Sequence, residues 1–237
     1  MRIIAGPNGS GKSVLKINLE REVPLDFYEY LNADELLKDI SDKGYYEFRN
    51  GEKFEDLQNF AAESSYKRKI REFFANGSVY SKGKKVFFKD SAVNAYAISL
   101  LVAFLSSHLI LAGKSFSFET VFSSDEKIKL IRQAADKGYK VYIYCISTEV
   151  AEINVGRIEN RVADGGHDVP SKKVKERYPK SLKNIAVAID FADRAYFFDN
   201  TSDKTRYIAS RDKNKPFHVH VKEADIPKWF MKYFPIK

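Results

Sequence analysis

The sequence predicts an α/β fold in which helices cover both faces of a parallel sheet. Two observations support this prediction. A glycine-rich motif lies between a strand-like run and a helix-like run within residues 2–21, and strands alternate with helices from residue 91 onward. Strands that alternate with helices run in the same direction because each helix carries the chain back across the sheet. We expect the 237 residues to form a single domain.

The glycine-rich motif has the pattern G-x-x-x-x-G-K-S over residues 6–13. Glycines let backbone N–H groups turn inward around phosphate oxygens, and the N-terminus of the next helix attracts anions. Lys12 would place its charge between the β- and γ-phosphates, and the Ser13 hydroxyl would coordinate Mg²⁺. The motif therefore predicts a P-loop NTPase fold with ATP and Mg²⁺ as cofactors. The residues expected to contact the nucleotide are Gly6, Asn8, Gly9, Ser10, Gly11, Lys12 and Ser13.

The composition is typical of a globular protein, with 44% apolar and 30% charged residues and no run long enough to span a bilayer. The N-terminus opens directly into the first strand, so we expect no signal peptide and a cytoplasmic location. The single cysteine, Cys145, lies in an apolar run and is expected to be buried. The net charge of +8 suits an enzyme that holds polyphosphate, and no nucleic-acid-binding motif accompanies the lysine clusters. We therefore expect neither a membrane nor a nucleic-acid partner.

The first elements are a strand at 2–5, a helix at 13–21 and a second strand at 27–32. The second strand brings Asn32 and Asp34 to the carboxyl end of the sheet, where ligands bind in open α/β folds. A helix follows at 35–40, so Asp34 is either the N-cap of that helix or a catalytic acid.

Residues 43–85 are rich in Tyr, Phe, Lys and Glu, and we interpret them as a helical insertion. A strongly apolar helix at 91–111 follows and is expected to pack on the sheet. The strand at 114–118 then leads into Glu119 and Thr120. An acid at the end of a buried strand is typical of the metal-side carboxylate of P-loop proteins, and a surface acid is the alternative.

The remaining elements alternate regularly. The predicted helices lie at 124–137, 149–162 and 173–193, and the predicted strands lie at 140–147 and 195–198. A strand pair at 206–210 and 217–221 and a helix at 224–234 follow. A polar break that contains Gly165 and Gly166 separates two of the helices, so we expect residues 162–180 to form a helical lid.

Phosphoryl transfer requires a nucleotide cradle, a metal, cations on the transferred group and a carboxylate near the attacking hydroxyl. Asp34 and Glu119 follow strands that should end at the same sheet edge as Ser13. One of these acids would accept the proton of the substrate, and the other would hold the water shell of the metal or a substrate hydroxyl.

Arginines flank the polar break. Arg157 and Arg161 lie at i and i+4 on one helix face, and Arg177 follows the break. Arginines on a closing segment can bind ATP phosphates and exclude water from them. His167, within the break, is expected to be a lid residue that bonds to the backbone or to substrate.

The motifs follow one another as A-G-P-N-G-S-G-K-S, N-A-D, S-F-x-F-E-T, K-G-Y-K-V, R-V-x-x-G-G-H-x-V-P, R-Y-x-x-S-L-x-N and D-N-T. In this order, from Ile4 to Thr201, the chain resembles the zeta toxin family of P-loop kinases. The resemblance implies an ATP-dependent phosphotransferase that acts on a hydroxyl of a small molecule. The characterised branch phosphorylates UDP-N-acetylglucosamine, and an antitoxin protein is the partner that the resemblance implies.

The resemblance also implies roles for individual residues. Asp34 would be the general base and Lys12 the phosphate lysine, and Arg161 or Arg177 would be the lid cation. The expected substrate-side residues are Asn32, Glu119, Thr120 and His167, and further nucleotide contacts are expected from Arg157 and Asn200.

Two other functions stay open. One is a P-loop ATPase or nucleotide-gated interaction module without a small-molecule acceptor, although the sequence has no ABC-type signature and no apolar run ending in Asp-Glu. The other is a nucleoside or RNA-end kinase, which only the basic charge favours.

Overall fold

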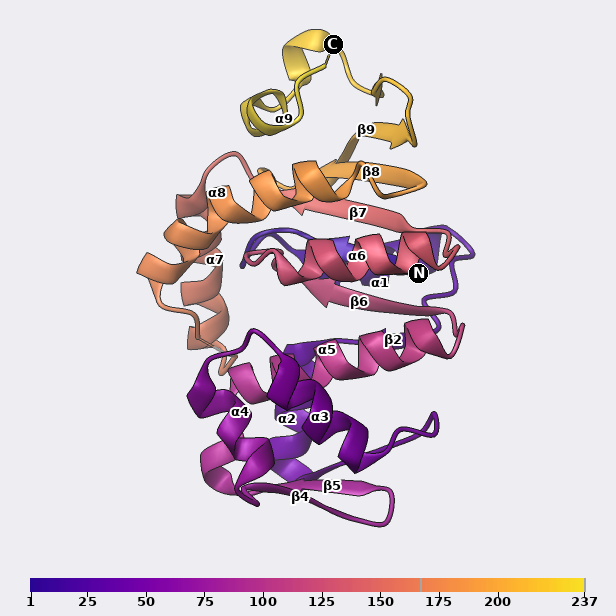
Figure 1. The fold of residues 1–237 in the computed structure, drawn as a ribbon. Helices are drawn as coiled ribbons and strands as arrows, with labels where there is room; N and C mark the ends of the chain where they lie inside the picture. The colour runs from indigo at the N-terminus through magenta and orange to yellow at the C-terminus, as the bar shows by residue number, and fades with distance from the viewer. Residues whose placement is uncertain (167, 237) are drawn as a thin grey trace. The chain divides into compact units, whose positions relative to one another are not determined.

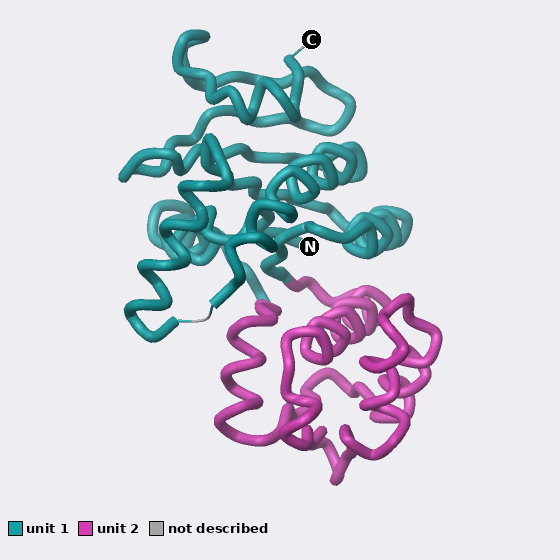
Figure 2. The backbone as a smooth tube through the Cα atoms, turned by 90° about the vertical axis from the view of Figure 1, so that its left-hand side faces the viewer, with its two compact units in different colours: residues 1–28, 117–237 teal, residues 29–116 magenta. Residues whose placement is uncertain are grey.

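The computed structural model describes residues 1–166 and 168–236. The chain divides into two compact units, of which unit 1 comprises Met1–Tyr28 and Ser117–Lys237 and unit 2 comprises Glu29–Phe116 (Figure 2). The segment 43–85, which the sequence marked as an insertion, lies entirely within unit 2.

A mostly parallel sheet forms the centre of unit 1. Its strands are β1 (Arg2–Ala5), β6 (Phe116–Thr120), β7 (Tyr142–Ser147), β8 (Arg194–Asp199), β9 (Arg206–Asp212) and β10 (His218–Val219). They lie side by side in the order β10-β9-β8-β7-β1-β6. The pairs β1/β6, β1/β7 and β7/β8 are parallel, and β9 and β10 are antiparallel additions at one edge.

Helices cover both faces of this sheet, which confirms the predicted α/β fold class. The helices of unit 1 are α1 (Lys12–Glu22), α6 (Glu126–Asp136), α7 (Ala151–Ala163), α8 (Ser171–Ala188) and α9 (Lys228–Tyr233), with a short 3₁₀ turn at Glu223–Asp225. In Figure 1, α6 and α8 lie in front of the strands and α1 lies behind them. The arrows of β6 and β7 point toward the side on which α7 stands, so α7 lies at the carboxyl edge of the sheet.

The strands of unit 1 are apolar because both of their faces are covered. Ile3, Ile4 and Ala5 of β1 have no exposed surface, and the thiol of Cys145 in β7 is buried as predicted. Burial also raises the pKa of this thiol far above its ordinary value, so Cys145 is a core residue and not a nucleophile.

Unit 2 contains strands that the sequence analysis did not predict. Its elements are β2 (Glu29–Leu31), α2 (Ala33–Lys43), β3 (Tyr45–Glu47), α3 (Phe54–Glu63), α4 (Arg68–Ala75), β4 (Val79–Lys82), β5 (Lys85–Phe88), a 3₁₀ turn at Asp90–Ala92, and α5 (Ala95–Leu111). Strands β3, β5 and β4 form an antiparallel sheet, and β3 and β4 lie within the segment 43–85 that was expected to be helical. These strands are short, so their alternating pattern is weak against the surrounding helical residues.

The apolar helix α5 is the centre of unit 2, where it contacts α2, α3 and α4. Its buried side chains are not confined to one stripe, since Leu100, Leu101 and Phe104 are buried as well as Ile98 and Leu105. A helix that is apolar all round is enclosed by other elements. Within residues 1–166 and 168–236, no helix is both long enough and apolar enough to cross a membrane.

Candidate nucleotide-binding site

The loop from Gly6 to Ser13 connects β1 to α1 at the carboxyl edge of the sheet. Gly9 and Gly11 have φ angles of 76° and 96°, which L side chains rarely adopt. A Cβ on Gly6 would lie 2.1 Å from the carbonyl oxygen of Ile146 in β7, and one on Gly9 would lie 2.5 Å from that of Asn154 in α7. The glycines therefore let the loop curl tightly against two neighbouring elements.

Lys12 and Ser13 both contact Glu119 of β6. The register of the parallel pair sets Ile4 of β1 beside Glu119, so the carboxylate lies next to the end of the loop. Its Oε1 is 3.9 Å from Nζ of Lys12, and its Oε2 accepts a hydrogen bond of 3.0 Å from the Ser13 hydroxyl. Lys12 is buried, and its Nζ also donates to the Pro7 carbonyl at 3.1 Å. The interpretation of Glu119 as an isolated surface acid is thus wrong.

The donor set at this point fits Mg²⁺. A serine hydroxyl and a carboxylate, 3.0 Å apart, supply the hard oxygen ligands that this ion prefers. Among the described residues, no cluster of three or more His, Cys, Asp or Glu side chains is arranged to hold a metal by itself. Such a site suits an ion that is bound mainly by water and nucleotide phosphates.

Thr120 supports both the start of the loop and the turn that follows β6. Its carbonyl accepts a hydrogen bond from the Gly6 N–H, and its hydroxyl accepts one from the Phe122 N–H. Phe122 is buried with φ at 61°, an unusual conformation for a bulky residue. Asn184 of α8 donates to the Phe122 carbonyl at 3.0 Å, so a residue of the R-Y-x-x-S-L-x-N motif fixes this strained turn.

Asn200 contacts the loop, and Arg157 contacts the turn that carries Asn200. The Asn200 side chain donates to the Ser10 carbonyl at 2.9 Å, and its backbone N–H donates to Ser147. Arg157 donates to the carbonyl of Ser202 at 3.4 Å. The structure therefore brings these two predicted nucleotide-side residues to one turn beside the loop.

Asn154 is a residue of this region that sequence reasoning missed. It is fully buried in α7, its backbone carbonyl faces Gly9, and its Oδ1 accepts a hydrogen bond of 2.7 Å from Thr148.

Several buried polar atoms of the loop and of α7 have no hydrogen-bond partner among residues 1–166 and 168–236, namely Asn8 Oδ1, Ser10 Oγ, Asn154 Nδ2 and Arg157 Nη1. Buried polar groups are normally paired, so their gathering at one loop fits a site for a polar ligand.

The Gly165-Gly166 pair ends helix α7 in a defined way. Gly166 N–H donates to Arg161 O and Gly165 N–H donates to Val162 O, the two bonds of a Schellman motif. Gly165 has φ at 83°, and a Cβ on Gly166 would lie 2.6 Å from Cγ of Arg161. The polar break that the sequence indicated therefore begins with a Schellman motif, which ends α7 at this point.

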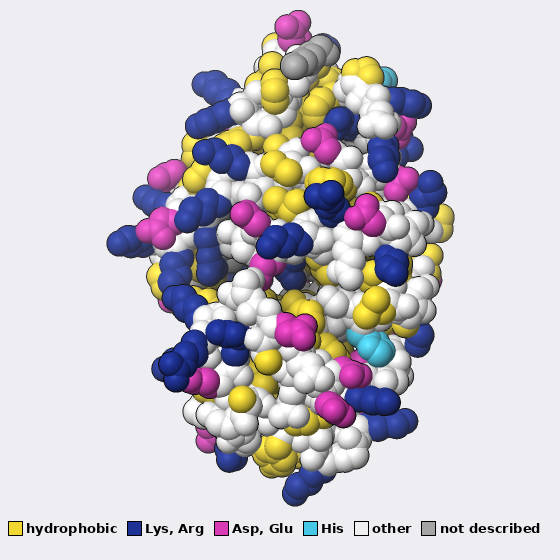
Figure 3. Space-filling view, in the orientation of Figure 1, with side chains coloured by type: hydrophobic (Ala, Val, Ile, Leu, Met, Phe, Trp, Pro, Cys, Tyr) yellow, Lys and Arg dark blue, Asp and Glu magenta, His cyan; other side chains and the backbone are white. Residues whose placement is uncertain are grey.

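The arginines expected on the lid lie on α7 and α8. Arg161 is exposed near the end of α7, and Arg177 is half-buried on α8. Lys and Arg side chains gather over these two helices, on the left-hand side of Figure 3. His167 lies outside the described residues.

Asn32 and Asp34 belong to unit 2. Of the two interpretations of Asp34, the N-cap is wrong, because helix α2 is capped two residues earlier. Asn32 is the N-cap of α2, since its Oδ1 accepts hydrogen bonds from the N–H groups of Asp34 and Glu35. Its Nδ2 donates a hydrogen bond of 3.2 Å to Oε1 of Glu35, so the amide also contacts a side chain of the first turn. Asp34 therefore lies in the first turn, and its carboxylate is not needed as a cap.

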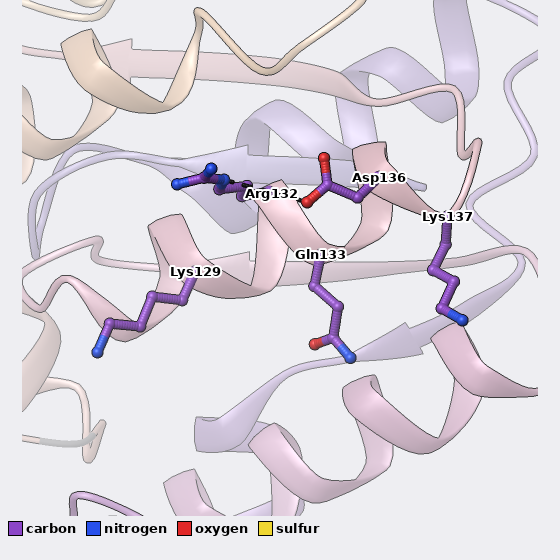
Figure 4. Close-up of a pocket in the computed structure, with 5 residues that line it drawn as sticks. All are labelled: Lys129, Arg132, Gln133, Asp136 and Lys137. Atoms are coloured by element: carbon purple, nitrogen blue, oxygen red, sulfur yellow. Dashed lines mark ion pairs between the residues drawn. The ribbon is translucent and has the colours of Figure 1, made fainter.

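A surface hollow of unit 1 lies away from these residues. It is lined by Lys129, Arg132, Gln133, Asp136 and Lys137, all from α6 or its C-terminal end (Figure 4). Arg132 and Asp136 form an exposed ion pair of 4.0 Å across one turn of the helix. Because it offers one solvated helix face without convergent groups, this hollow is not a candidate site.

Fold and loop together define a P-loop protein of the kinase-like α/β class. Residues 67–220 match the sequence profile of the family described as Zeta toxin. This match covers well over half of the chain, so the chain belongs to the zeta toxin family, as the resemblance indicated.

Individual relatives are distant. An uncharacterised protein of Haemophilus influenzae is 35% identical over 63 residues, which are 27% of this chain and 45% of that protein. The AvrRxo1-ORF1:-ORF2 crystal structure with ATP shares 16% identity with a TM-score of 0.53, covering 92% of this chain and 60% of the other. A structure of the PezAT toxin-antitoxin system of Streptococcus pneumoniae shares 12% identity over 86% of this chain and 70% of the other, with a TM-score of 0.49. The chain thus spans less than half of its curated relative and three fifths of the AvrRxo1 chain.

Proposed function

We propose that this protein is an ATP-dependent phosphotransferase that moves the γ-phosphate to a hydroxyl of a small molecule. The contact of Glu119 with both Lys12 and Ser13 is the observation that carries this proposal. It sets a carboxylate, an ammonium and a hydroxyl at one sheet edge, and a nucleotide with its metal requires these groups. The kinase-like fold and the family membership support the same conclusion.

Each group has a distinct role at the donor side. The N–H groups of the loop would bind the β- and γ-phosphates, with Lys12 between them. Ser13 and Glu119 would hold Mg²⁺, which when bound neutralises the charge of the phosphates. The hydrogen bond between Ser13 and Glu119 favours this metal-side role over the substrate-side role that the family resemblance implied for Glu119.

The acceptor side would be supplied by Asp34 as general base. The cap formed by Asn32 fixes the first turn of α2 and so the backbone that carries Asp34. Since both polar atoms of the Asn32 amide are engaged in that cap, we assign Asn32 to orienting Asp34 instead of binding substrate through them. Thr120 and His167 complete the proposed substrate side.

Cations from α7 and α8 would close on the transferred phosphate. Arg161 and Arg177 are the proposed lid cations, because arginine can bind phosphate oxygens in a bidentate manner. Arg157 would contact the nucleotide beside Asn200, where one of its nitrogens is buried without a partner in the described part of the chain. Residues 162–180 would act as the lid.

A UDP-sugar such as UDP-N-acetylglucosamine is the acceptor that we propose first. The AvrRxo1 structure holds two proteins, so we also propose an antitoxin protein as a partner of this chain. Membership of the zeta toxin family supports both proposals.

Incubation with Mg²⁺, ATP and a metabolite extract, followed by mass spectrometry, tests the function. A single species that gains one phosphate is expected, and UDP-N-acetylglucosamine alone should then be tested. Lys12→Ala is the control and should show no product, because it lacks the phosphate-binding ammonium. ATP hydrolysis that depends on a partner, with no phosphorylated metabolite, would instead identify a nucleotide-gated module. Competition by RNA, but not by sugar nucleotides, would identify an RNA-end or nucleoside kinase, which the net charge of +8 favours.

A further inference from the structure

Asp199 is a buried carboxylate at the end of β8 that the proposed mechanism does not use. Its side chain is 1% exposed, and three donors from different parts of the chain converge on it. Oδ1 accepts hydrogen bonds from the Thr201 hydroxyl at 2.6 Å and from Nε1 of Trp229 at 2.9 Å. Oδ2 pairs with Arg206 of β9 at 3.0 Å. A buried carboxylate with this many donors holds its surroundings in one conformation.

The turn that Asp199 holds also supports the nucleotide loop. Asn200 is the next residue, and its side chain donates to the Ser10 carbonyl at 2.9 Å. A Cβ on Gly11 would lie 2.4 Å from Nδ2 of Asn200, so the amide presses directly on the loop. The conformation of residues 199–201 thus determines whether the amide reaches Ser10.

Helix α9 is tied to the same turn. Trp229 is 2% exposed, and Phe230 and Phe234 pack on Phe197 of β8 with ring centroids 5.2 and 4.8 Å apart. The Lys228 N–H donates to Glu149, whose own N–H donates to the Thr201 hydroxyl. The family match ends at residue 220, so α9 lies outside the matched segment.

We propose that Asp199 and Trp229 are positioning residues that hold Asn200 against the loop, so that α9 is a working part of the nucleotide site. This inference rests on the proposed function. It goes beyond that function because it assigns the C-terminal helix a part in nucleotide affinity. Nucleotide binding and the surroundings of Trp229 are therefore coupled through Asn200 and Asp199.

Trp229 is the only tryptophan of the chain, so its fluorescence reports on α9 directly. The full chain is titrated with Mg²⁺ and ADP while emission is recorded, and the same titration is followed by calorimetry. A saturable change in emission with the calorimetric midpoint is expected. Unchanged emission despite calorimetric binding overturns the coupling. Absence of calorimetric binding overturns the nucleotide site itself, and the coupling with it.

Substitutions in α9 distinguish a positioning role of Trp229 from a general structural contribution of the helix. Trp229→Phe keeps an aromatic ring but removes the donor to Asp199, and it should weaken ADP binding about threefold to tenfold. Tyr233→Phe removes a polar atom from the same helix and is the matched control, which should leave affinity unchanged. Equal affinities for wild type and Trp229→Phe would overturn the proposal.

A double-mutant cycle supplies a readout that general destabilisation would not give. Asn200→Ala should weaken ADP binding about tenfold, because the loop loses the support at Ser10. If α9 acts through Asn200, adding Trp229→Phe should weaken binding no further in this background. Additive losses of affinity would show that α9 acts independently of Asn200 and would overturn the coupling.

Discussion

The two units hold their candidate functional residues by different means. In unit 1, the loop residues are fixed by partners far away in sequence, since Ser13 contacts Glu119 and Ser10 contacts Asn200. In unit 2, the residues around Asp34 are fixed locally, by an N-cap two positions earlier. The proposed donor side thus depends on contacts between distant parts of unit 1, whereas the proposed acceptor side depends on one helix turn.

Replacement of the proposed base should have the largest effect. Asp34→Asn should lower the rate of phosphate transfer about 10²-fold to 10⁴-fold, because general base catalysis contributes in this range. Affinity for Mg²⁺ and ATP, measured by calorimetry, should stay unchanged because the loop is in unit 1. Asp39→Asn removes a carboxylate of the same helix that pairs with Lys43, and as the control it should transfer phosphate normally. Normal transfer by the Asp34 variant would remove Asp34 from this role.

A matched pair of glycines tests the difference between the units. Gly9 and Gly51 have φ angles of 76° and 84°, but a Cβ would lie 2.5 Å from a backbone oxygen at Gly9 and would meet no atom within 4 Å at Gly51. Gly9→Ala should weaken ADP binding by more than about tenfold, because the loop must move away from α7. Gly51→Ala should cost only about 1 kcal/mol of stability and leave affinity intact. Calorimetry and thermal unfolding measure the two effects, and equal losses of affinity would contradict the comparison.

The N-cap that holds the helix turn of Asp34 can be weakened by a substitution of Asn32 alone. Asn32→Ala should lower the free energy of unfolding by about 1 kcal/mol, since it removes the acceptor for two helix N–H groups. Asn32→Ser should recover most of this loss, because serine is also a good cap. Urea unfolding provides the measurement. An alanine variant as stable as wild type would show that the cap does not fix this turn.

The smallest expected effect concerns Lys127, whose ammonium lies 5.6 Å from the ring centroid of Phe118. Burial lowers the pKa of Lys127 from 10.5 to about 8. The folded state therefore binds fewer protons than the unfolded state between pH 8 and 10.5, and the stability contributed by this residue rises with pH in that window. Lys127→Met should raise the free energy of unfolding by about 1 kcal/mol at pH 7, after allowance for its partly exposed side chain.

The increase in the free energy of unfolding caused by Lys127→Met should become smaller as the pH rises from 8 to 10.5. Over this range wild-type Lys127 becomes neutral in the unfolded state as well as in the folded state. Denaturant unfolding at pH 7 and pH 10 checks the trend. Lys129→Met, at an exposed position of the same helix, is the matched control for the loss of one lysine. A constant difference between wild type and Lys127→Met at both pH values would contradict the assignment.

The sequence predicted most of unit 1 and less of unit 2. Runs such as residues 142–147 are long and apolar, so they could be recognised as strands. The family could be identified from motifs at the ends of the strands. In unit 2, strands of three or four residues among helices carry too short a pattern to be recognised. The shift of the cap from Asp34 to Asn32 has a similar reason, since both residue types cap helices well and only the hydrogen bonds distinguish them.

The α/β class, the glycine-rich loop and the family could be read from the amino-acid sequence, because they depend on local composition and on the order of motifs. The distant groups that reach the loop could not be read from it, because they are brought there by the folding of the chain. Glu119 reaches Ser13 through the register of β1 and β6, and Trp229 reaches Asp199 through the packing of α9. No local sequence pattern specifies such contacts between distant residues, because they follow from how strands align and how side chains pack between helices and strands.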